Sequence, residues 1–195
     1  MNPPDLSIWR TQRLTLSRPT AADLAALCAM EQDSATMASL GGTCPAAETE
    51  ARLGRLQAHW DAHGFGWWIV RNTHTGQFVG RGGLRWVRLP EGPRVEVGYG
   101  FLRAHWNKGF ATELAAESIR VGFEVLDLEE IHSFTLPGNG ASRRVMEKCG
   151  LRYWSEGLWG DRPHVFYKLG RDVWSPGRDD SVGKQKSPDN KMPGY

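Results

Sequence analysis

A glutamate that alternates with small residues is the first feature of the sequence that could do chemistry. Along the segment 94–102, alternate residues are expected to share one face of a strand, and Glu96 then lies beside Gly98 and Gly100. The two glycines leave room for a substrate and water next to the carboxylate. Glu96 is therefore a candidate general base. The alternative is a solvated carboxylate, or one that is paired with Arg94 on the same face.

A loop that leads directly from this strand into a helix is the second feature. Such a junction directs unpaired backbone N–H groups and the positive end of the helix dipole at one point, which predicts an anion site. Gly109 and Ala111 let a phosphate approach the backbone, and Arg103 and Lys108 add positive charge. The sequence contains neither Gly-x-x-x-x-Gly-Lys-Ser/Thr nor Gly-x-Gly-x-x-Gly, which argues against nucleoside triphosphates and dinucleotides. A simple tight turn is the alternative.

Hydrophobic periodicity predicts the elements that position these two features. The predicted strands are residues 13–17, 67–71, 77–87, 94–102, 131–136, 151–159 and 163–170. Two predicted helices start at Ala21 and Gly109, and two more are predicted over residues 47–63 and 141–148. A strand–helix–strand unit within 94–136 requires a parallel pair and a right-handed crossover. The fold class is therefore α+β, with a mixed and mostly antiparallel twisted sheet of about seven strands and helices on both faces.

Composition narrows the class of protein. The 195 residues carry a formal net charge of +2, which gives no strong field for nucleic acid. Cys28, Cys44 and Cys149 are widely spaced, so neither a disulfide scaffold nor a zinc ribbon is expected. No secretory signal and no bilayer-length apolar run is visible. We expect a cytoplasmic protein without a metal, nucleic-acid or membrane partner, and a disordered tail over residues 175–195, which are almost free of apolar side chains.

Several segments together resemble a known family. Residues 106–113, Trp-Asn-Lys-Gly-Phe-Ala-Thr-Glu, are similar to the pyrophosphate loop of the GNAT superfamily, in particular its RimJ/RimL ribosomal-protein acetyltransferase branch. The family pattern Gln/Arg-x-x-Gly-x-Gly/Ala is met at Gly109 and Ala111, whereas Trp106 takes the first place, as it often does in that branch. The other matching segments, in the family's order, are residues 10–16, 95–99 and 139–151, and the likeness covers about residues 8–174.

The resemblance implies the GNAT fold over a domain of residues 1–174, with a central βαβ unit that binds acetyl-CoA. It implies an N-acetyltransferase in which a primary amine attacks acetyl-CoA, the co-substrate, directly within a ternary complex while Glu96 accepts the proton through water. Many members protonate the leaving thiolate with a tyrosine, whose place here is taken by Met146, so Ser142 is the expected substitute. Asn139 either bonds the cofactor or only caps its helix.

The resemblance also implies which residues contact the cofactor. A backbone N–H near Phe101 or Leu102 is expected to stabilise the oxyanion, and Gly98 and Gly100 suit a bulge where strands splay apart. The expected cofactor-binding residues are Phe101, Leu102, Arg103, Trp106, Asn107, Lys108, Gly109, Phe110, Ala111, Thr112, Asn139, Ser142 and Lys148.

The acceptor, the acyl donor and the oligomeric state stay open at this point. Protein N-termini, polyamines, amino acids and antibiotics all carry suitable amines, and no motif constrains the groove residues 20–66 and 152–166. A CoA-binding module without turnover is the alternative from another class. An enzyme for a longer acyl-CoA such as succinyl-CoA is the alternative within the class. A homodimer is possible, because dimers are common among similar enzymes.

Overall fold

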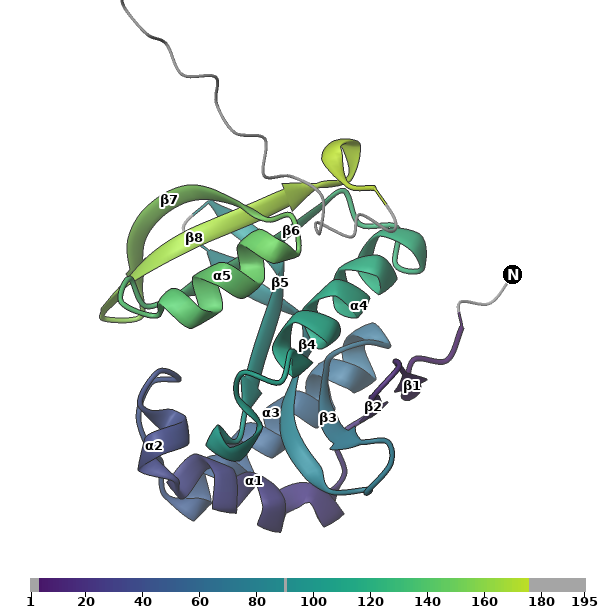
Figure 1. The fold of residues 1–195 in the computed structure, drawn as a ribbon, viewed down its shortest axis with the longest axis vertical. Helices are drawn as coiled ribbons and strands as arrows, with labels where there is room; N and C mark the ends of the chain where they lie inside the picture. The colour runs from purple at the N-terminus through teal and green to yellow at the C-terminus, as the bar shows by residue number, and fades with distance from the viewer. Residues whose placement is uncertain (1–3, 90, 176–195) are drawn as a thin grey trace, which may run out of the picture.

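An eight-stranded sheet forms the centre of the computed structural model, which describes residues 4–89 and 91–175 (Figure 1). The strands are β1 (Ile8–Arg10), β2 (Leu14–Ser17), β3 (Trp67–Asn72), β4 (Phe78–Leu89), β5 (Gly92–Phe101), β6 (Glu130–Thr135), β7 (Arg152–Trp159) and β8 (Arg162–Gly170). The helices are α1 (Leu24–Gln32), α2 (Ser34–Met37), α3 (Ala46–His63), α4 (Phe110–Glu124) and α5 (Gly140–Lys148), with single 3₁₀ turns at Ala21–Asp23, Arg103–His105 and Arg171–Val173.

The strand order confirms the predicted fold class. The strands follow one another as β1-β2-β3-β4-β5-β6-β8-β7, and every neighbouring pair is antiparallel except β5 and β6. The prediction of about seven strands missed β1, which pairs with β2. Three residues are too few to show an alternating pattern, so only the pairing reveals this strand.

Helices cover both faces of the sheet (Figure 1). On one face, α4 packs its fully buried Leu114 against Leu84 of β4 and Val97 of β5. On the other face, Leu27 of α1 and Leu53 of α3 enclose Ile69 of β3, and the segment after α2 lies near the end of β5. Each fully buried aliphatic side chain of this kind stabilises the fold by about 1.5–3 kcal/mol.

The parallel strands β5 and β6 separate almost at once. Their pairing over the described residues rests on one register pair, Glu96 with His132, and next to it the Ser133 hydroxyl donates to the Val97 carbonyl over 2.8 Å. By contrast, β4 and β5 stay in continuous register from Gly92 to Phe101. The bulge expected at Gly98 and Gly100 is therefore not present, and the sheet opens on the β6 side alone.

Two further observations concern the described residues only. None of their helices is both long and apolar enough to cross a bilayer. No group of three or more His, Cys, Asp or Glu side chains within 4–89 and 91–175 is arranged to hold a metal ion. The tail predicted for 175–195 lies, apart from Ser175, outside the described part of the chain.

Candidate active site

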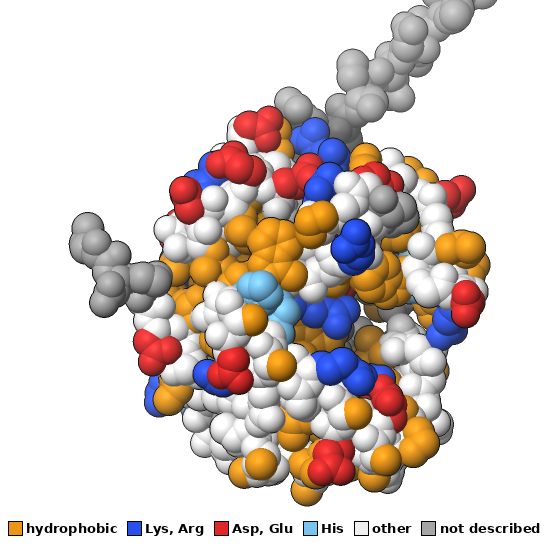
Figure 2. All heavy atoms as spheres, turned by 180° about the vertical axis from the view of Figure 1, so that it is seen from behind, with side chains coloured by type: hydrophobic (Ala, Val, Ile, Leu, Met, Phe, Trp, Pro, Cys, Tyr) orange, Lys and Arg blue, Asp and Glu red, His pale blue; other side chains and the backbone are white. Residues whose placement is uncertain are grey.

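A cavity of about 830 Å³ opens where β5 and β6 separate. Its walls come from both strands, from the start of α4, from α5 and from the segment after α2, and Figure 2 shows a hollow with Lys and Arg side chains around it. The predicted site residues that line it are Glu96, Phe101, Trp106, Asn107, Gly109, Phe110, Ala111, Thr112, Asn139, Ser142 and Lys148. Three predicted cofactor contacts, Leu102, Arg103 and Lys108, do not line it.

The loop between β5 and α4 presents a row of unpaired backbone N–H groups to this cavity. Asn107 and Gly109 have positive φ angles of 59° and 79°, and Gly109 is the N-cap of α4. Among the described residues, no N–H from 107 to 112 donates to a protein acceptor, and the first to do so is Glu113, to the Gly109 carbonyl at 3.0 Å. Free amides at the positive end of a helix are suited to a phosphate.

A carboxylate on α4 fixes this loop to the start of the chain. Glu113 accepts hydrogen bonds from the Thr11 hydroxyl at 2.5 Å, the Arg13 amide at 2.8 Å and Arg13 Nε at 2.6 Å. Arg13 Nη1 also donates to the Lys108 carbonyl at 2.8 Å. Burial opposes ionisation of Glu113, but these bonds outweigh burial and hold its pKa below the ordinary value. This contact was not predicted from the sequence, although Arg13 and Glu113 both lie in segments similar to the family.

Glu96 is buried at the floor of the cavity, with only 4% of its surface exposed. Its Oε2 accepts a hydrogen bond from Arg85 Nε at 2.8 Å, and the Arg85 guanidinium stacks 4.1 Å above the Trp67 ring. Arg94, the partner considered from the sequence, instead faces Glu130 at 3.9 Å. Within the described chain, Oε1 of Glu96 has no hydrogen-bond donor, so this oxygen is available to a water or an amine.

The space expected above the two glycines of β5 is not empty. A Cβ on Gly98 would lie 2.5 Å from Cζ2 of Trp67, and a Cβ on Gly100 would lie 2.8 Å from Cδ1 of Leu40. The glycines therefore admit two large side chains from β3 and from the segment after α2, and these side chains form the wall around Glu96. Both glycines nevertheless line the cavity together with Glu96, so room for a substrate and water remains beside the carboxylate.

Ser142 belongs to a hydrogen-bonded group on α5. Its amide donates to the Asn139 side chain at 3.1 Å, so Asn139 does cap the helix. The Tyr99 hydroxyl lies 3.1 Å from the Ser142 carbonyl, to which it donates, and 3.2 Å from Ser142 Oγ. Burial raises the pKa of Tyr99 above its ordinary value, so its hydroxyl stays protonated. Tyr99 is a site residue that sequence reasoning missed.

The amide of Leu102 is already occupied, because it donates to the Val79 carbonyl at 2.9 Å. It is thus not available to an oxyanion. Phe101, which lines the cavity, is the remaining candidate of the two. The Phe101 carbonyl accepts from Trp106 Nε1 at 2.7 Å, which ties the loop back to the end of β5.

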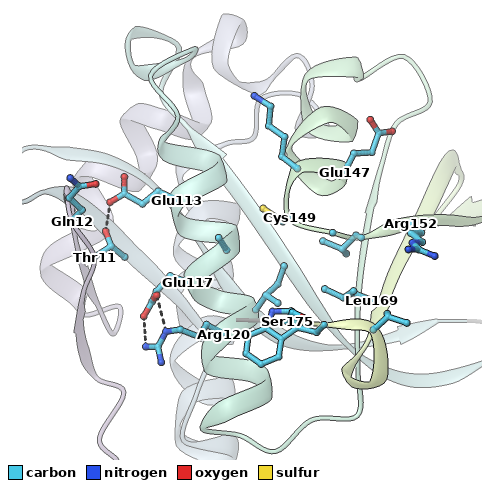
Figure 3. A pocket seen from close by; sticks show the side chains of 17 residues that line it. Thr11, Gln12, Glu113, Glu117, Arg120, Glu147, Cys149, Arg152, Leu169 and Ser175 are labelled. Atoms are coloured by element: carbon cyan, nitrogen blue, oxygen red, sulfur yellow. Dashed lines mark hydrogen bonds and ion pairs between the residues drawn. The ribbon is translucent and has the colours of Figure 1, made fainter. Parts of the chain in front are cut away.

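A second cavity, of about 680 Å³, lies on the other side of α4, between the N-terminal strands, α5 and the last described residues (Figure 3). Its lining includes the carboxylates Glu113, Glu117 and Glu147. Of the predicted site residues, only Lys148 reaches it. Arg120, Lys148 and Arg152 also line it, so its acidic and basic side chains balance and it lacks the excess of positive charge that the first cavity offers to the phosphates of CoA.

A sheet that opens beside an amide-rich helix start, with a buried carboxylate in the opening, is an arrangement suited to an acyltransferase that uses an acyl-CoA. A family model described as the acetyltransferase (GNAT) domain matches residues 13–152. The chain belongs to this family of acetyl-CoA-dependent N-acetyltransferases.

Individual relatives agree with this assignment. The uncharacterised protein YkkB of Bacillus subtilis is 31% identical over 137 residues, which are 65% of this chain and 80% of that protein. The structure of an acetyltransferase from Agrobacterium tumefaciens has a TM-score of 0.75 and 25% identity, covering 84% of this chain and 94% of that one. The ribosomal-protein-S5-alanine acetyltransferase of Vibrio fischeri has a TM-score of 0.67 over 87% and 99% of the two chains, and at 16% identity this likeness concerns the fold alone.

Proposed function

We propose that this chain transfers an acetyl group from acetyl-CoA to a primary amine by direct attack within a ternary complex. The observation that carries the proposal is the shared cavity: the free amides between Asn107 and Thr112 open into the same space as the carboxylate of Glu96. A diphosphate and a proton acceptor are the two things that such an enzyme must hold in one place.

The cofactor is proposed to lie across the opening of the sheet. Its diphosphate takes hydrogen bonds from the start of α4, and the cations Arg144 and Lys148 on α5 lie along the same cavity. The pantetheine arm follows the fork between β5 and β6, which residues 98–101 and 133–136 line. The acyl end then reaches the neighbourhood of Glu96.

The reaction needs three groups in this arrangement. An alkylammonium, with a pKa of about 10, passes a proton through water to Glu96 Oε1 and attacks the thioester carbonyl carbon. The Phe101 N–H stabilises the oxyanion as the new C–N bond forms. When the C–S bond breaks, the thiolate takes a proton from Ser142, and the second proton of the amine, lost as the amide forms, restores the Ser142 hydroxyl through water. Tyr99 lies 3.2 Å from Ser142 Oγ and holds it in position. A thiolate of pKa about 8.5 can also leave unprotonated.

Binding of CoA is the first test. Titration calorimetry of the purified chain with CoA is expected to show one saturable site, and free thiol released from acetyl-CoA with a panel of amines is expected to show turnover. Saturable binding without thiol release for any amine would favour the CoA-binding module instead. Initial rates at several concentrations of both substrates should give intersecting lines, since parallel lines indicate a covalent acyl-enzyme.

Glu96→Gln tests the general base. This change keeps the size of the side chain and removes its proton affinity, so turnover near neutral pH is expected to fall about 100-fold or more while the Kd for CoA is retained. Glu129→Gln is the matched control, because the Glu129 side chain is 86% exposed and lies outside the cavity. Unchanged turnover in Glu96→Gln would remove Glu96 from the mechanism.

The setting of the enzyme follows as part of the same proposal. Residues 1–174 are proposed to form the catalytic domain of a cytoplasmic protein, since Cys28, Cys44 and Cys149 are free thiols that suit a reducing compartment. The RimJ/RimL branch is proposed on the sequence segments together with the fold likeness to the Vibrio fischeri enzyme.

A further inference from the structure

The charges in the cavity restrict the acceptor, given the proposed function. Glu96 is the only acidic side chain of the described residues that lines it. The basic side chains are Arg85, Arg144, Lys148 and Arg162. Arg144 and Lys148 lie on α5 beside the proposed phosphate site. Arg85 and Arg162 are therefore the basic side chains in the rest of the cavity, where the acceptor would bind. A polycationic amine would meet one carboxylate here, and that carboxylate is already paired.

The wall around Glu96 offers hydrogen-bond donors. Arg85 forms an ion pair with Glu96, so the two charges offset each other. Trp67 is 9% exposed, and its indole Nε1 is buried without an acceptor among the described residues. The Trp67 ring and Glu96 Oε1 approach the same point, within about 3 Å of a Cβ placed on Gly98. A buried N–H that can only donate, next to the proposed base, calls for an oxygen from a ligand.

Arg162 carries the uncompensated charge at the mouth of the cavity. It begins β8, it is exposed, and its Nη1 comes within 3.8 Å of the place that a Cβ would take on Gly41, across the cavity. Within the described chain no carboxylate lies within ion-pair distance of its guanidinium. Trp159 and His164, also in the lining, flank it on the β7–β8 hairpin.

We propose that the acceptor is a small primary amine that carries a carboxylate, with the carboxylate bound by Arg162 at the mouth and the amine facing Glu96. A guanidinium matches a carboxylate with two parallel hydrogen bonds. Arg162 lies at the exposed entrance, whereas the acyl group of the donor lies at the buried floor. The guanidinium of Arg162 is therefore placed to bind the acceptor and not the acyl chain of the donor.

The test is a series of ω-amino acids of increasing length, each compared with its own primary amide, in the thiol-release assay with acetyl-CoA. A charge-assisted hydrogen bond to a carboxylate corresponds to about a 10- to 100-fold difference. For the ω-amino acid that is long enough to reach from Glu96 to Arg162, kcat/KM is expected to be about 10- to 100-fold higher than for its amide. Polyamines and aminoglycosides are expected to be poorer than the best amino acid.

Arg162→Gln is expected to bring the ratio of acid to amide close to one, with the Kd for CoA unchanged. Arg88→Gln is the control: Arg88 is an exposed arginine of β4 outside the cavity, and its removal should leave the ratio as it is. Equal rates for acids and amides in the unmodified protein would overturn the inference. A preference for succinyl-CoA over acetyl-CoA with neutral amines would also overturn it. The same holds if peptides without an acidic group react as fast as the best amino acid. Thiol release in any of these cases keeps the proposed function, whereas no release with any amine refutes the function itself.

Discussion

Replacing Gly109 with alanine probes the proposed diphosphate site, and the chain provides a matched control in Gly64. Both glycines cap helices in the left-handed region, with φ of 79° and 71°. An added Cβ would meet only the end of the Arg13 side chain at Gly109, at 3.2 Å, and nothing within 4 Å at Gly64. Each alanine is therefore expected to lower the free energy of unfolding by about 1–2 kcal/mol, measured by urea denaturation.

The two variants should differ in their affinity for CoA. At Gly109 the new methyl group is attached within the run of free amides from 107 to 112, where a phosphate is proposed to approach the backbone. Loss of one charge-assisted hydrogen bond is worth about 1.5–3 kcal/mol, which raises the Kd for CoA about 10-fold or more. Gly64→Ala should retain the original Kd in the same calorimetric titration. Equal Kd values for the two variants would refute the assignment of this loop to the diphosphate.

Two further predictions concern the fold beneath the site. Glu31 is 1% exposed and accepts from the buried Arg81 Nη2 at 3.0 Å, so Glu31→Ala should lower the free energy of unfolding by about 3–5 kcal/mol, whereas the exposed Glu50→Ala should change it little in urea denaturation. Burial disfavours the charge of Glu31, but Arg81, Cys44, Arg52 and Thr49 together outweigh burial and lower its pKa. Burial lowers the pKa of His132. Both groups then bind fewer protons folded than unfolded, so the urea midpoint should fall as the pH drops, first below about 6.5 and again below about 4. A midpoint that rises or stays constant from pH 8 to 4 would contradict this assignment.

The elements could be predicted because their signals are local. The alternation of Val95, Glu96 and Val97 marks β5, and Gly64 marks the end of α3, with no need for tertiary information. β1 could not be predicted in this way, since its three residues become a strand only by pairing with β2.

The site was predictable where one segment carries it, as with Glu96 and the loop at Gly109. Its contacts between distant segments were not. The partner of Glu96 is Arg85 and not Arg94 because the β4–β5 register places Arg85 opposite Glu96. Register follows from the pairing of whole strands, which the spacing within one strand does not encode. In the same way, Tyr99 meets Ser142 only because α5 folds over β5.

The single register pair between β5 and β6 divides the sheet into two half-sheets, β1–β5 and β6–β8–β7. Over the described residues their main chains are in register only at Glu96 and His132, next to the hydrogen bond from the Ser133 hydroxyl to the Val97 carbonyl. Main-chain groups along the rest of the two facing edges are left to other partners. An extended molecule with amide groups of its own, bound between the edges of β5 and β6, would act as an additional strand. It would connect the two half-sheets by hydrogen bonds. Arg162 stands on one half and Glu96 on the other, so the same occupant would also set the span between the charge that admits a substrate and the carboxylate that activates it.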